Sequence, residues 1–128
     1  MALAHDIKLI ILFGSRAKGT AGPRSDTDIA VLADHPLNLE EKAEIGTGVV
    51  RELGVSEDAL DIVDLWDAPP LLQHQIANHG RLLRGDPSDF LRFKVLAWKR
   101  YQDTAKFRRA REKALVNRYG QRSHSQKD

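Results

Sequence analysis

The sequence predicts an α/β fold, because short apolar runs typical of buried strands alternate with segments of helical periodicity. Its 128 residues are enough for one domain with one hydrophobic core. No apolar run reaches the roughly 18 residues that span a bilayer, and the absence of cysteine excludes disulfides and thiolate metal sites. The N-terminal residues lack the long apolar segment of a signal peptide, so we expect a cytoplasmic protein with no membrane partner.

Three strands are predicted, together with a short edge strand, over residues 7–13, 26–32, 59–66 and 81–84. The first is a run of β-branched and apolar residues that ends at Gly14, which is typical of a fully buried strand. In the second, acidic and apolar residues alternate, so Asp26 and Asp28 are expected on one face while Ile29 and Val31 face the core.

Two helices are predicted between these strands. The first covers 38–54, with Asn38 as its N-cap. Gly46 and Gly48 inside it are interpreted as packing contacts, because no strand directly precedes them as a phosphate-binding loop requires. The second helix opens at the prolines of 69–70 and stops at Gly80.

A long C-terminal helix is predicted from a cap at Ser88 or Asp89 to about Tyr119. Its apolar residues spread over more than half of the helical wheel, which is wider than one docked face needs. We therefore expect a body formed by residues 1–85, a helix at 86–120 that packs on this body, on a partner or on both, and a disordered tail at 121–128.

Charge is unevenly distributed along the chain. Residues 1–80 hold 6 Lys or Arg against 13 Asp or Glu, whereas residues 81–128 hold 14 against 5. An acidic body therefore carries a basic C-terminal segment. That segment is either a solvated helix face or a docking surface for an acidic protein or RNA.

The motif with the clearest chemistry is Gly14-Ser15, followed after ten residues by Asp26 and Asp28. A tight glycine turn can present backbone N–H groups and a hydroxyl to phosphate. Two carboxylates at i and i+2 of a strand share one face, roughly 7 Å apart along the chain. This combination suits a divalent cation that carries a nucleoside triphosphate.

A site with two metal ions needs a third carboxylate, and Asp61 and Asp64 on the third strand compete for this place. Because they lie three positions apart, their side chains face opposite sides of the sheet, and only one can join Asp26 and Asp28.

With this motif, residues 8–85 resemble the minimal nucleotidyltransferases of the polymerase-beta-like superfamily, and among them the antitoxin partners of HEPN-domain ribonuclease toxins. The resemblance implies a small polymerase-beta-like α/β (α+β) fold: a mixed sheet flanked by helices, with a catalytic domain at 1–85 and a long C-terminal helix. The segment ALDIVDL is similar to the third strand of the family and places Asp61, not Asp64, at the catalytic position.

The resemblance also implies ATP as substrate, two Mg²⁺ ions, and in-line attack of an acceptor hydroxyl on the α-phosphorus. It assigns metal binding and catalysis to Asp26, Asp28 and Asp61, and nucleotide binding to Gly14, Ser15, Arg16 and Lys18.

No histidine or tryptophan is assigned to a catalytic or ligand-binding site. The histidines show no metal-ligand spacing and are predicted to have surface roles: His5, His35, His74, His79 and His124. The two tryptophans, Trp66 and Trp98, are interpreted as core residues or interface anchors.

Four functions compete. The leading one is an antitoxin that transfers AMP to a tyrosine of a HEPN toxin with which it forms a hetero-oligomer. A second is neutralisation by occlusion alone, through the C-terminal helix and its expected interface residues Trp98, Tyr101 and Arg108. Intact acidic residues favour the enzyme, because binding alone needs none of them. Transfer to a small molecule requires an acceptor pocket, and transfer to RNA is left open by the basic segment but not favoured.

Overall fold

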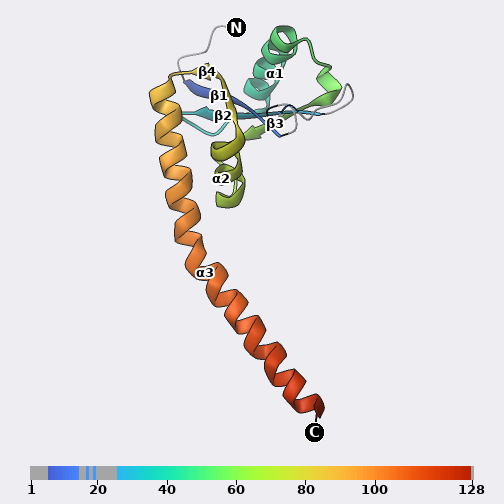
Figure 1. Ribbon diagram of the computed structural model, residues 1–128. Coiled ribbons are helices and arrows are strands. Elements are labelled where there is room, and N and C mark those ends of the chain that lie inside the picture. The colour runs from blue at the N-terminus through green and yellow to red at the C-terminus, as the bar shows by residue number, and fades with distance from the viewer. Residues whose placement is uncertain (1–5, 15–16, 18, 20–25, 128) are drawn as a thin grey trace.

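The computed structural model describes residues 6–14, 17, 19 and 26–127, and it confirms a mixed sheet flanked by helices (Figure 1). The strands form one sheet in the order β3-β2-β1-β4, in which β1 is antiparallel to both neighbours and β2 is parallel to β3. The strands are β1 (Ile7–Phe13), β2 (Thr27–Ala33), β3 (Leu60–Asp64) and β4 (Arg81–Gly85). The helices are α1 (Leu39–Leu53), the short 3₁₀ turn η1 (Glu57–Ala59), α2 (Pro70–His79) and α3 (Pro87–Lys127).

Helices cover both faces of the sheet (Figure 1). On one face, Ile29 and Val31 of β2 are fully buried in a cluster with Ile45 and Val49 of α1. The opposite face is covered by α2 and the first half of α3, whose buried residues form a second cluster with the sheet: Leu9, Ile11, Ala30, Ile76, Phe93 and Ala97. The alternation predicted for β2 therefore separates its residues between two packed layers.

Helix α1 begins and packs as its sequence indicates. Asn38 caps it: its side chain accepts a hydrogen bond from the Glu41 N–H at 2.8 Å, and the Glu41 carboxylate accepts one from the Asn38 N–H at 3.1 Å. Gly46 is buried, and a side chain there would lie 3.3 Å from Ile62 Cδ1 of β3. The prediction that Gly46 is a packing contact is confirmed.

Helix α3 differs from the prediction at both ends. Its cap is Asp86, not Ser88 or Asp89, because the Asp86 carboxylate accepts hydrogen bonds from the backbone N–H and the hydroxyl of Ser88, each at 2.8 Å. Pro87 then occupies the first helical position, which suits proline. At the other end the helix runs to Lys127, through the tail expected to be disordered. One glycine costs a helix about 1 kcal/mol relative to alanine, so Gly120 alone does not end it.

The first half of α3 belongs to the same core as the sheet. Phe90, Phe93 and Ala97 are buried, and the last described residue of the helix to be buried is Ala105. From there to position 117 every side chain is exposed, and this half projects away from the body (Figure 1). Among the helices that the structure describes, none has a stretch both long and apolar enough to cross a membrane.

Candidate active site

The proposed catalytic aspartates of β2 and β3 lie side by side. Asp28 is the register partner of Asp61 in the parallel β2–β3 ladder and of Phe13 in the β1–β2 ladder. Adjacent strands lie about 4.8 Å apart, and register partners present their side chains on the same face. Asp28 is half-buried, whereas Asp61 and Asp26 are exposed. The structure thus brings two of the three carboxylates together on neighbouring strands, with the third two residues earlier.

These carboxylates influence one another. Burial, followed by the negative charges of Asp61 and Asp26, raises the pKa of Asp28 above its ordinary value. The negative charge of Asp28, which is partly desolvated and close to like charges, is therefore poorly compensated by the described protein groups. Oxygen ligands in this state favour a hard divalent cation.

Gly14 closes the site at the end of β1. Its φ of 73° lies in the left-handed region, and a Cβ there would come 2.4 Å from Asp28 Oδ2. Only glycine combines this backbone conformation with so close an approach to the carboxylate. The other residues that the sequence assigns to nucleotide binding, Ser15, Arg16 and Lys18, lie outside the described part of the chain.

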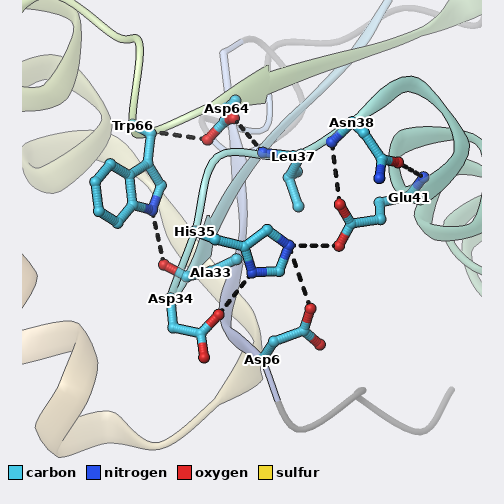
Figure 2. Close-up of polar contacts among 9 residues, drawn as sticks. All are labelled: Asp6, Ala33, Asp34, His35, Leu37, Asn38, Glu41, Asp64 and Trp66. Atoms are coloured by element: carbon cyan, nitrogen blue, oxygen red, sulfur yellow. Dashed lines mark hydrogen bonds and ion pairs between the residues drawn. The ribbon is translucent and has the colours of Figure 1, made fainter.

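Asp64 occupies the opposite side of β3, as the three-residue separation from Asp61 predicts. It is buried, and its carboxylate accepts hydrogen bonds from the backbone N–H of Leu37 at 2.8 Å and of Trp66 at 3.0 Å (Figure 2). Asp64 therefore fixes the loop before α1 and the end of β3. Asp64 is thus a hydrogen-bonded structural residue and not a surface one.

A cavity of about 280 Å³ lies between the end of β1 and helix α2, next to the aspartates. The described residues that line it are Phe13, Gly14, Gln75 and His79. The sequence predicts only a surface role for His79 and carries no prediction for Gln75. Helical periodicity shows which residues of α2 share a side, but only the tertiary structure shows which side meets the glycine turn.

Neither tryptophan is a core residue, which corrects one of the two interpretations given for them. The side chain of Trp66 is 52% exposed and that of Trp98 is 55% exposed. Trp66 still contributes to structure, because its indole Nε1 donates a hydrogen bond to the Ala33 carbonyl at 2.9 Å (Figure 2).

A second polar cluster surrounds His35, at the opposite end of β1 from Gly14 and roughly 20 Å away along the strand. Its Nδ1 lies 2.6 Å from the Asp34 carboxylate, and its Nε2 lies 2.6 Å from Glu41 and 3.4 Å from Asp6 (Figure 2). The hydrogen bonds to Asp34 and Glu41 raise the pKa of His35 to about 9. The imidazole is thus cationic at neutral pH and bridges three acidic groups, although Asp6, His35 and Glu41 also have the geometry to hold a metal ion.

The expected interface residues on α3 have different surroundings. Trp98 is exposed, whereas the Tyr101 ring stacks on His74 of α2 with a centroid separation of 3.9 Å. The Arg108 guanidinium lies 3.9 Å from the centroid of the same tyrosine ring. Tyr101 is therefore held between two side chains of its own chain.

Comparisons with known proteins show what this chain is similar to. Residues 2–88 match the family model described as polymerase beta, nucleotidyltransferase. Protein adenylyltransferase MntA of Aphanizomenon flos-aquae is 34% identical over 90 residues, which are 65% of this chain and 60% of that protein. The protein of the same name from Shewanella oneidensis is 35% identical over 96 residues, 75% of this chain and 67% of that protein. The chain thus spans about two thirds or less of these relatives.

Solved structures show similarity over more of the chain. A crystal structure described as a toxin-antitoxin with AMP-PNP superimposes with a TM-score of 0.72 and 32% identity, covering 88% of this chain and 89% of that one. A structure of a tri-AMPylated Shewanella oneidensis HEPN toxin in complex with MNT antitoxin gives 0.66 and 29%, covering 88% and 86%. The matched length includes much of α3 as well as the sheet.

Proposed function

Because the chain belongs to the polymerase beta nucleotidyltransferase family, we propose that it is an antitoxin that transfers AMP from ATP to a tyrosine of a HEPN-domain toxin. The observation that carries this proposal is the pairing of Asp28 with Asp61 in one ladder, directly against the glycine turn at Gly14. The names of the relatives and the AMPylated toxin in one matched complex support the acceptor class. The reaction belongs in the cytoplasm, where ATP is available, and cell fractionation tests this location.

The acidic residues fit two Mg²⁺ ions. Asp26 and Asp28 would hold the ion that accompanies the triphosphate. The same two residues, together with Asp61, would hold the second ion. Carboxylate oxygens are preferred ligands of Mg²⁺, and the raised pKa of Asp28 reflects first its burial and then the neighbouring negative charges, which a cation would neutralise. When bound, such ions neutralise the phosphates and lower the pKa of an acceptor hydroxyl.

In the proposed reaction the acceptor oxygen forms a bond to the α-phosphorus as the bond to the β-phosphate oxygen breaks, so that pyrophosphate leaves. Asp61, the exposed carboxylate beside Asp28, accepts the proton of the tyrosine hydroxyl. The backbone N–H of Gly14 and the side chain of Ser15 hold the β- or γ-phosphate, and Arg16 and Lys18 neutralise its charge.

The partner is proposed to dock on α3 through Trp98, Tyr101 and Arg108. Support comes from the exposure of Trp98 and from the projecting basic half of the helix. Neutralisation by occlusion is the second candidate, because an exposed apolar helix surface can cover a toxin without chemistry. The matched toxin-antitoxin structures are compatible with both.

Replacing Asp26 and Asp28 together by Asn tests the enzyme. We expect AMP transfer from radiolabelled ATP to a purified HEPN partner to be abolished, because the ion on the triphosphate loses two anionic ligands. Binding of AMP-PNP in titration calorimetry should lose its dependence on Mg²⁺. The circular dichroism spectrum should be unchanged, since the substitutions remove like-charge repulsion.

The matched control replaces two exposed acidic residues on other parts of the fold in one protein, Glu44 of α1 by Gln and Asp67 after β3 by Asn. This control should transfer AMP at the rate of the unmodified chain. Unchanged transfer by the Asp26 and Asp28 variant would eliminate the proposed site. Toxin neutralisation without transfer would favour occlusion.

A further inference from the structure

The cavity beside Gly14 shares a wall with the carboxylate site. Gly14 lines the cavity of about 280 Å³ and also packs against the Asp28 carboxylate. Phe13, which lines the same cavity, is the register partner of Asp28. A nucleotide whose phosphates lie at Gly14 and Asp28 therefore has this cavity as an adjoining space.

The fold fixes the far wall of this cavity. Gln75 and His79 are four positions apart on α2, so they lie on the same side of the helix. Gly80 ends the helix in close contact with β1, because a Cβ there would come 2.5 Å from Ile11 Cγ2. Two residues after His79, Arg81 already pairs with the Leu12 position of β1. The end of α2 is thus held against the strand that leads to Gly14.

The chemistry of the described wall does not suit a triphosphate. The described residues of this wall are a phenylalanine, a glycine, a glutamine and a histidine, and none of these four is a lysine, an arginine or a carboxylate. Planar rings bind nucleobases by stacking. A glutamine amide can accept a hydrogen bond from N6–H of adenine through its oxygen and donate one to N7 through its NH₂ group. Guanine presents two acceptors, N7 and O6, on the same edge, so the amide oxygen would have no donor there.

We propose that this cavity receives the base of the nucleotide, that Gln75 selects adenine, and that His79 supplies a planar surface for the ring. The assignment rests on the proposed nucleotidyltransferase function and adds to it the determinant of nucleotide preference. It gives α2, which lies outside the glycine and aspartate motif, a direct role in substrate recognition.

The test uses the full chain and two probes that need no acceptor, AMP-PNP and GMP-PNP, titrated calorimetrically with Mg²⁺. The unmodified chain should bind AMP-PNP more tightly. Gln75→Leu keeps the shape of the side chain but removes its donor and acceptor, and should reduce this preference about 5- to 150-fold. Gln102→Leu, at an exposed position of α3, is the matched control and should leave the preference unchanged.

His79 is tested with the same probes. His79→Ala should weaken the binding of both nucleotides about 5- to 150-fold, the range found for base stacking. His79→Phe should retain most of the affinity, because it keeps a planar ring. Inorganic tripolyphosphate, which has no base, should bind all variants equally. Weaker tripolyphosphate binding by His79→Ala would make the cavity a phosphate site and overturn the proposal.

An unchanged preference in Gln75→Leu, with an unchanged circular dichroism spectrum, would also overturn it. If the Asp26 and Asp28 variant still loses Mg²⁺-dependent binding in that case, the enzymatic function stands and only the base site fails. If the unmodified chain binds neither nucleotide, both proposals fail.

Discussion

At the scale of single residues, Asp61 and Asp64 show how one strand separates chemistry from structure. Asp61 is exposed beside the half-buried Asp28, whereas Asp64 is buried and accepts two backbone hydrogen bonds. The exposed carboxylate of Asp61 can bind a ligand or accept a proton. That of Asp64 is committed to backbone N–H groups that would otherwise be buried without a partner.

Asp61→Ala should therefore lose transfer activity, whereas Asp64→Ala should lose stability. Asp61→Ala should reduce AMP transfer at least about 100-fold, the lower range for loss of a catalytic base, without changing the urea unfolding midpoint. Asp64→Ala should lower the free energy of unfolding by about 2 kcal/mol, because two buried donors lose their acceptor. Transfer rates corrected for the folded fraction decide the assignment, and a larger loss at Asp64 would reverse it.

The shared face of Asp26 and Asp28 could be predicted from sequence, because alternation along a strand is a local signal. The choice of Asp61 over Asp64 came from the family resemblance of the third strand. The position of His79 beside Gly14 could not be predicted from sequence. Its position depends on the close contact between Gly80 and Ile11 and on the pairing of β4 with β1, which are nonlocal. The same is true of His35, whose three acidic neighbours include Asp6, 29 positions earlier in the chain.

At the scale of elements, the His35 cluster joins three segments of the chain. Asp6 precedes β1, Asp34 and His35 follow β2, and Glu41 lies in the first turn of α1. Glu41 also closes the capping box of α1, so the position of that helix depends on the same carboxylate. The backbone hydrogen bond from Asn38 and the contact with His35 lower the pKa of Glu41.

This cluster should make stability depend on pH. Because its pKa in the folded protein is raised from 6.5 to about 9, His35 contributes fully below about pH 6.5, and the contribution is lost as pH rises through 9. The urea midpoint should fall between pH 6.5 and 9.5. In His35→Gln this fall should be absent, and Asp34→Asn should shift it to lower pH by removing the largest cause of the raised pKa.

Measurement of the midpoints at pH 6, 7.5 and 9.5 for the three proteins decides this prediction. An equal fall in His35→Gln would assign the pH dependence to other groups. The lowered pKa of Glu41 acts in the opposite direction, since its contribution is complete above the ordinary glutamate pKa and is lost as pH falls below that value through the lowered one.

Element boundaries were predicted best where a local device sets them. Strand β1 begins and ends as expected because Gly14 and its positive φ terminate a run of β-branched residues. The Asn38 cap and Gly54 do the same for α1. The ends of α3 were predicted wrongly, because Asp86 and Pro87 compete with Ser88 as a start signal and a polar sequence does not by itself end a helix.

At the scale of the whole molecule, the charge division has a structural counterpart. Of the 18 acidic residues, 13 lie in residues 1–80, while the basic half of α3 projects from the body for about 33 Å beyond Ala105. A deletion after Gly85 would remove Phe90, Phe93 and Ala97 from the core, so it would test folding, not docking. Point substitutions on α3 are the appropriate probe.

Trp98→Ala should weaken binding of the HEPN partner about thirtyfold or more, because truncated interface aromatics cost about 2 kcal/mol or more. Transfer to a free acceptor peptide should be unaffected. Leu71→Ala removes a comparably exposed apolar side chain from α2 and is the control. Reversing the charges of Arg108, Arg109 and Arg111 should slow association and reduce its salt dependence. Partner affinity unchanged by both α3 variants in surface plasmon resonance would exclude this helix as the docking surface.

The projecting half of α3 also bears on how an acceptor is presented. If the proposed HEPN partner docks on this helix and its tyrosine reaches the glycine turn, transfer becomes a reaction within one assembly, at an effective concentration in the millimolar range when the connection is short and flexible. Under that condition the carboxylate site needs little affinity of its own for the acceptor. On the proposed function, selectivity for one toxin would then reside in the tether, and the domain would need no deep acceptor pocket of its own.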